Sequence, residues 1–233
     1  MSLTVQSAIK QILELEEDST ISQVAKSASS GSLMGARGNS GVILSQLFRG
    51  FASGLEGKEE VNTMDLAESF KLAADMAYKA VMKPTEGTIL TVARESAESL
   101  NSNLSKAHDI SGAFTILLEQ GYRTLANTPE MLPVLKQAGV VDAGGKGYLT
   151  VLEGMFAGLQ GEVIQKDHTS NVEGENGSRS TFPVSEDYLI SPEDITFQYC
   201  TELLINVLPG NETSHEEIKE FLEEIGDCVL VVG

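Results

Sequence analysis

From residue 3 to residue 160 the chain repeats one pattern, in which apolar residues recur three or four positions apart within segments that short polar connections separate. This spacing places the apolar side chains on one face of an α-helix. Short connections make consecutive helices antiparallel neighbours. The pattern therefore predicts a mainly α fold, either a helical bundle or a helical barrel, with no strand in this stretch.

Capping residues and helix breakers predict where these helices begin and end. Polar residues that accept a hydrogen bond from the first turn mark the starts, and proline or glycine marks the ends. Helices are expected in this order: a first with its apolar stripe from Val5 to Leu13, a second capped by Ser19, a third from a glycine loop to about Gly54, a fourth from Asn62 to Pro84, a fifth from Thr88 to Leu104, a sixth capped by Asp109, a short seventh opened by Thr128-Pro129, and a last one after Gly147.

The chain changes character after residue 163. Residues 164–192 are polar and contain Gly and Ser, which predicts a flexible acidic linker. Apolar and polar residues then alternate over 195–207, which predicts a strand. Ser214 and Glu217 predict a capping box for a helix ended by Gly226, and the run 228–232 predicts a second strand.

These patterns divide the chain into three parts. We expect a helical domain over residues 1–163, the linker over 164–192, and the start of an α/β domain over 193–233. About 40 residues cannot bury a sheet face alone, so the last part is expected to be the front edge of a larger domain.

Composition limits the partners. The formal net charge of −18 argues against nucleic acid and against anionic membranes. No apolar run approaches the roughly 20 residues of a membrane span, and no signal peptide is visible. Cys200 and Cys228 are too few for a disulfide framework and fit small core residues better than metal ligands. A cytoplasmic protein is therefore expected.

Three glycine-bearing segments precede helices: Gly-Ala-Arg-Gly-Asn-Ser-Gly over residues 35–41, Lys-Pro-Thr-Glu-Gly-Thr over 83–88, and Asp-Ala-Gly-Gly-Lys-Gly over 142–147. Glycine lets backbone N–H groups approach a ligand, and a helix N-terminus adds unpaired donors and partial positive charge, so each segment suits phosphate. In an alternating bundle the first two share one end. The third joins them only if the short seventh helix does not fully reverse the chain. The alternative is three plain connecting loops.

Other polar residues add less. Arg37 and Lys146 are candidates for positive charge beside a phosphate, although Lys146 fits a solvated surface better. Asp142 fits a helix cap better than a ligand contact. The three histidines, His108, His168 and His215, lie in polar surroundings and are expected at the surface. No carboxylate cluster suited to magnesium occurs in residues 1–163.

Together, the three glycine-bearing motifs resemble those of the nucleotide-binding L-subunit of dihydroxyacetone kinases (DhaL-like), and more closely those of the ATP-binding subunit of bacterial fatty acid kinase. The likeness spans about residues 1–163 and continues at 197–202 into that family's middle domain. The resemblance implies an eight-helix antiparallel barrel with ATP and Mg²⁺ at one end. It places Gly38, Asn39, Ser40 and Gly41 on the ATP phosphates, and Thr85, Gly87, Thr88, Asp142 and Gly144 along the rest of the nucleotide site.

The resemblance also implies a reaction. In the family the γ-phosphoryl group of ATP passes to a fatty acid carried by a DegV-type partner protein. The family's magnesium-binding aspartate loop would precede Met1, so the Mg²⁺ ligands and a first helix are expected upstream, and this fragment alone is expected to be inactive. The alternative is a non-catalytic nucleotide- or ligand-binding regulatory module. A homodimer is one candidate oligomeric state.

Overall fold

The structure is a computed structural model and describes residues 1–162, 213–226 and 229–232, together with Thr201, Leu203, Ile205, Asn206, Leu208 and Gly210. Its helical elements are α1 (Ser2–Ile12), α2 (Ile21–Gly35), α3 (Gly38–Gly54), α4 (Thr63–Ala80), α5 (Ile89–Ser102), the 3-10 turn η1 (Leu104–Lys106), α6 (Ile110–Met131), α7 (Pro133–Ala138), α8 (Ala143–Leu159) and α9 (His215–Ile225).

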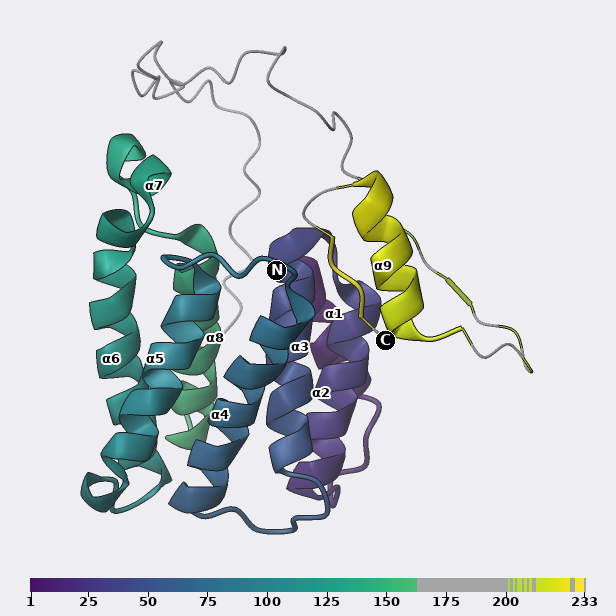
Figure 1. The fold of residues 1–233 in the computed structure, drawn as a ribbon. Coiled ribbons are helices and arrows are strands. Elements are labelled where there is room, and N and C mark those ends of the chain that lie inside the picture. Colours follow the sequence, from purple (N-terminus) through teal and green to yellow (C-terminus); the bar gives the residue numbers. More distant parts are fainter. Residues whose placement is uncertain are drawn as a thin grey trace, which may run out of the picture.

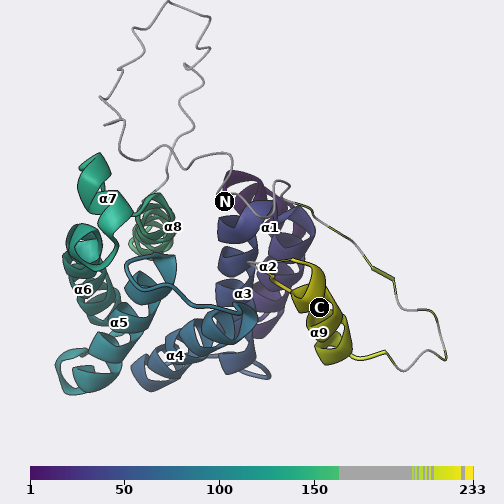
Figure 2. The same cartoon turned by 45° about the horizontal axis from the view of Figure 1, so that its top comes forward.

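The long helices form an antiparallel barrel, as the sequence predicted. Consecutive helices from α1 to α6 pack side by side, and α8 packs against both α5 and α6 (Figure 1). Viewed closer to one end, the helices follow one another around the molecule from α1 to α8 (Figure 2). At one end of the barrel Met1 lies beside α8, because a Cβ added at Gly147 of α8 would lie 3.1 Å from the Met1 sulfur.

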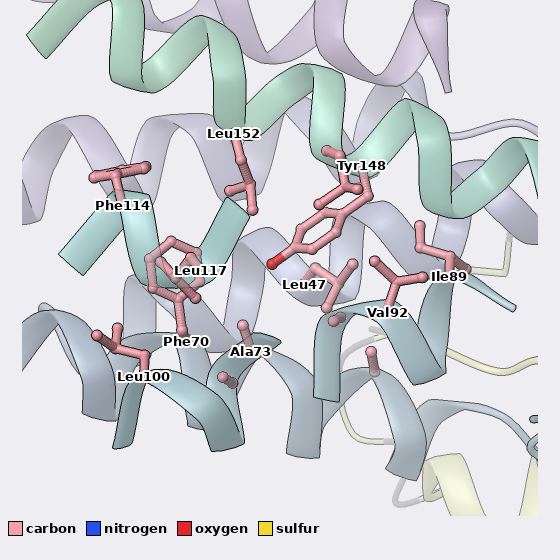
Figure 3. Close-up of a cluster of buried hydrophobic side chains, with 14 of the residues drawn as sticks. Leu47, Phe70, Ala73, Ile89, Val92, Leu100, Phe114, Leu117, Tyr148 and Leu152 are labelled. Atoms are coloured by element: carbon pink, nitrogen blue, oxygen red, sulfur yellow. The ribbon is translucent and has the colours of Figure 1, made fainter. Parts of the chain in front are cut away.

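The core fills the space between α3, α4, α5, α6 and α8. Figure 3 shows Tyr148 and Leu152 of α8 pointing inward, with Leu47 and Val92 from α3 and α5 close to Tyr148. Four phenylalanines, contributed in turn by α3, α4, α6 and α8, make a continuous row across the barrel: Phe51, Phe70, Phe114 and Phe156, with ring centroids 4.9, 6.1 and 5.7 Å apart. Contacts of this kind add to the burial of apolar area that stabilises the barrel.

Several predicted helix starts are confirmed. Asn62 accepts from the amides of Met64 and Asp65, and Asp109 accepts from Gly112. The second helix is an exception, because Thr20 rather than Ser19 caps α2 and forms a reciprocal capping box with Gln23. The fourth helix ends at Ala80, before the predicted stop at Pro84.

The prediction that Thr128-Pro129 opens a helix is wrong. Both residues lie inside α6, which continues to Met131, and Pro133 opens the short α7 instead. Pro129 has no amide hydrogen for the carbonyl of Leu125, four residues earlier. The Thr128 hydroxyl donates to that carbonyl at 2.7 Å, which lets the helix pass through the proline.

The last helix of the barrel also begins earlier than predicted. α8 starts at Ala143 rather than after Gly147, because Asp142 accepts from the Gly145 amide at 2.6 Å. The segment 144–147 is therefore the first turn of a helix. Likewise only Ala36 and Arg37 separate α2 from α3, so the first glycine segment is a two-residue break between helices.

The end of the chain matches the prediction in part. α9 forms with the predicted Ser214–Glu217 capping box and lies outside the barrel, beside α2 and α3 (Figures 1 and 2). The predicted linker 164–192 lies outside the described residues. Of the first predicted strand, Thr201, Leu203, Ile205 and Asn206 are described, and none is in a strand. Of the second, only Leu230 among the described residues pairs, in an isolated antiparallel bridge with Val81. Within the described part of the chain, no helix is long and apolar enough to cross a membrane.

Candidate functional site

Four helix N-termini meet at one end of the barrel. α1, α3, α5 and α8 all begin there (Figure 1). A Cβ added at Gly41 of α3 would lie 2.9 Å from the Thr4 hydroxyl of α1, and one added at Gly144 of α8 would lie 3.3 Å from the Ile89 Cβ of α5. The short α7 turns aside and does not carry the chain back to the other end, so all three glycine-bearing segments share this end of the barrel.

The start of α3 differs from the starts of α5 and α8 in its N-cap residue. Its N-cap residue, Arg37, makes no side-chain capping bond, whereas Thr88 caps α5 and Asp142 caps α8. Asn39 and Ser40 are exposed, and Gly38 has a φ of +65° with open space around the position of a Cβ. The first-turn N–H groups of a helix without a side-chain cap are donors for an anion, which the positive end of the helix dipole also favours.

The 83–88 loop is fixed by its own hydrogen bonds. Gly87 has a φ of +81°, and its amide donates to the Thr91 hydroxyl at 2.8 Å. The Thr88 hydroxyl donates to the Thr85 carbonyl at 2.8 Å. Gly87 thus adopts a positive-φ conformation that glycine takes more readily than other residues, while Thr85 is exposed at the surface of the loop.

Glu86 of this loop belongs to a network of charged and polar side chains from α4 and α5. The Glu86 carboxylate accepts from the Tyr78 hydroxyl at 2.9 Å, from the Thr91 hydroxyl at 2.7 Å and from the Arg94 guanidinium at 2.9 Å. Partial burial opposes ionisation of Glu86, but the hydrogen bonds from Thr91, Tyr78 and Arg94 together hold its pKa below the ordinary value. Glu86 is therefore an anion engaged with its own neighbours.

Asp142 is a helix cap, as the sequence favoured. Its carboxylate accepts from the Gly145 amide, and its own amide donates to the Thr128 hydroxyl at 3.1 Å. Thr128 thereby ties the start of α8 to the last turn of α6. Gly144 packs between the Asp142 carboxylate and Ile89, where a side chain would crowd both.

Both candidate cations, Arg37 and Lys146, are exposed, and each has hydrogen-bond partners within the chain. Lys146 is exposed, but its ammonium donates to the Tyr122 hydroxyl at 2.7 Å, and this hydrogen bond raises the pKa of Lys146. Tyr122 in turn donates to Glu153. Arg37 turns its guanidinium back onto the carbonyls of Met34 and Ala36 at the end of α2. Both side chains remain at the same barrel end and keep their charge there.

No metal site is present in the described residues. There, no group of three or more His, Cys, Asp or Glu side chains could hold a metal ion, so the described part of the chain does not fit the Mg²⁺ that the resemblance implies. His108 and His215 are exposed, as predicted. His168, Cys200 and Cys228 lie outside the described residues.

Sequence reasoning missed four residues at this end. Thr91 and Thr128 are buried and each both donates and accepts, and Glu86 is the hub of a network. Thr4 is fully buried, and its hydroxyl has no hydrogen-bond partner among the described residues. For Thr4, Thr91 and Thr128 the only sequence signal is a threonine on an apolar helix face. That signal does not reveal their hydrogen-bond partners.

Comparison with known proteins adds independent information. The DAK2 domain family matches residues 1–157, and the family of FakA-like fatty acid kinase middle domains matches residues 196–233. Protein YloV of Bacillus subtilis (strain 168) is 40% identical over 241 residues, which covers 100% of this chain and 42% of YloV. An uncharacterized protein of Staphylococcus saprophyticus is 42% identical over 236 residues, with the same two shares. The chain thus spans 42% of the length of these relatives.

Proposed function

The chain belongs to the DAK2 domain family, and we propose that residues 1–162 bind the phosphate groups of ATP at the barrel end where α1, α3, α5 and α8 begin. The observation that carries this proposal is the start of α3. Gly38, Asn39, Ser40 and Gly41 form the first turn of α3, whose N-cap residue, Arg37, makes no side-chain capping bond, at the barrel end where four helices begin.

In this proposal the residues have distinct roles. The amides of the first turn of α3 and the side chains of Asn39 and Ser40 donate to phosphate oxygens. The 83–88 loop, with Thr85, Gly87 and Thr88, and the Asp142–Gly144 corner form the neighbouring walls of the nucleotide site. Arg37 and Lys146 add positive charge at the rim.

We propose that the longer protein belongs to an ATP-dependent phosphotransferase. In the reaction, a carboxylate oxygen of a fatty acid, presented by a DegV-type partner, attacks the γ-phosphorus of ATP. The bond from that phosphorus to the oxygen bridging to the β-phosphate breaks, so that ADP leaves and an acyl phosphate forms. The role of the barrel is to position the phosphates and to stabilise their charge. The match of residues 196–233 to the fatty acid kinase middle domain supports this acceptor over dihydroxyacetone.

One observation favours a second candidate, a non-catalytic nucleotide-binding module. The described residues contain no set of side chains that could hold a metal ion. A chain that binds nucleotide without transferring phosphate would need no such set.

Calorimetric titration with ATP, ADP and adenosine tests the phosphate site directly. We expect affinity to fall in that order, because the phosphates make the contacts. Ser40→Ala should weaken ATP binding about tenfold, since a hydrogen bond to a charged group contributes about 1.5 kcal/mol or more. Ser53→Ala is the matched control, because Ser53 is an exposed serine at the opposite end of the same helix. Equal affinities for ATP and adenosine, or equal effects of the two variants, would contradict the proposal.

A further inference from the structure

Side chains of the two neighbouring helices, α4 and α5, hold the 83–88 loop in place. It connects α4 to α5, and Gly87 in it adopts a positive φ. A connection of this kind keeps one conformation only where side chains or backbone partners fix it. Three side chains outside the loop, Tyr78, Thr91 and Arg94, all bind one side chain within it, that of Glu86.

Thr91 joins this network to the backbone of the loop. Its side chain is fully buried in the first turns of α5. The hydroxyl accepts from the Gly87 amide at 2.8 Å and donates to the Glu86 carboxylate at 2.7 Å. A hydroxyl has one proton and two lone pairs, so it can do both at once. The negative charge of Glu86 orients the Thr91 proton, which leaves a lone pair directed at Gly87.

Arg94 and Tyr78 fix the other side of the Glu86 carboxylate. Arg94 also donates to the Tyr78 hydroxyl at 3.1 Å and pairs with Glu98 at 3.3 Å. The end of α4, the loop and the first two turns of α5 are thereby joined through one carboxylate. Because Glu86 is half exposed, the Coulombic attraction to Arg94 is screened, and the main effect of the network is geometric.

We propose that Glu86 and Thr91 are positioning residues of the nucleotide site, which hold the 83–88 loop in the conformation that presents Thr85 and Thr88 to the bound nucleotide. This inference rests on the proposed function and deepens it. Neither side chain touches the ligand in this account. Both act through the Gly87 peptide, which they hold at its positive φ.

The test compares variants that keep or lose the hydrogen bonds joining Gly87, Thr91 and Glu86 while leaving the core volume nearly unchanged. Thr91→Val removes the hydroxyl, and Thr91→Ser keeps it. Glu86→Gln and Glu98→Gln each remove one carboxylate from Arg94, but only Glu86 contacts the loop. For each full-length variant we would measure ATP affinity by calorimetry, the melting temperature, and hydrogen exchange in peptides covering residues 83–90.

We expect Thr91→Val and Glu86→Gln to weaken ATP binding five- to tenfold and to speed amide exchange in residues 83–90. Thr91→Ser and Glu98→Gln should stay within twofold of the wild type in both measurements. Exchange in α2, which packs against α1 and α3, should not change. If Thr91→Val unfolds the chain, Glu86→Gln, on the more exposed side of the network, decides the question alone.

Wild-type ATP affinity in Glu86→Gln, or exchange that rises throughout the barrel rather than in the loop, would overturn the inference. If the proposed function itself is wrong, the result is different: the wild-type chain binds ATP no more tightly than adenosine. The two failures are therefore distinguishable in the same set of titrations.

Discussion

Thr128 offers the sharpest test of how α6 tolerates its internal proline. Its hydroxyl is fully buried, donates to the Leu125 carbonyl at 2.7 Å and accepts from the Asp142 amide at 3.1 Å. Thr128→Val replaces the hydroxyl by a methyl group of similar size and leaves both backbone groups without that partner. Each lost hydrogen bond costs about 1 kcal/mol, so we expect the free energy of unfolding to fall by about 2 kcal/mol.

A double-mutant cycle separates the two bonds. Pro129→Ala restores an amide hydrogen that can bond the Leu125 carbonyl, so in that background Thr128→Val should cost only about 1 kcal/mol. Thr115→Val is the matched control, because the exposed Thr115 hydroxyl also donates to a carbonyl of α6, that of Ser111, and water can replace it. That control should change stability by less than about 0.5 kcal/mol.

Urea unfolding followed by far-ultraviolet circular dichroism suits this measurement, because the chain is rich in helix and has no tryptophan. For a domain of this size a loss of 2 kcal/mol corresponds to a fall of about 4–8 °C in melting temperature. An equal cost of Thr128→Val with and without the Pro129→Ala substitution would refute the role given to the threonine hydroxyl.

Two further expectations concern pH and magnesium. Because the pKa of Glu86 is lowered in the folded chain, its contribution to stability is present above its ordinary pKa and is lost as pH falls through the lowered value. The stability difference between wild type and Glu86→Gln should therefore be present at neutral pH and shrink as pH falls below the ordinary pKa of a glutamate, and a difference that grows on acidification in unfolding titrations would contradict the assignment. Because the described residues hold no metal-ligand set, ATP titrations of this chain with and without magnesium should agree within about twofold, and tight magnesium-dependent binding would show that ligands were overlooked.

Local signals predicted the parts of the fold that depend on neighbouring residues. The caps at Asn62, Asp109 and Ser214 work within one turn of helix, so the sequence contains all of their partners. The apolar period likewise determined which face of each helix points to the core. The antiparallel order followed from the short connections alone.

The errors arose where a distant or ambiguous partner decides the structure. Pro129 usually marks a boundary, but a hydroxyl next to it satisfies the carbonyl it leaves unpaired. The alternating run before residue 207 has the pattern of a strand, yet strands exist only as pairs, and in the described part of the chain Leu230 alone finds a partner, at Val81. The three glycine segments lie at helix starts, although the third is itself the first turn of α8, and only the structure shows that Arg37, unlike Thr88 and Asp142, makes no side-chain capping bond.

The antiparallel order of the barrel sets the range over which the proposed anion site can act. The ends of α2, α4 and α6 lie among the starts of α1, α3, α5 and α8, so opposing helix dipoles largely cancel a short distance away. At physiological ionic strength, a nucleotide more than roughly 8 Å from the start of α3 is affected only by the weak, screened field of a chain whose net charge is −18. If the proposed site is correct, the encounter with a nucleotide is therefore mildly repulsive and faster at higher salt, and attraction begins only at contact with the first turn of α3.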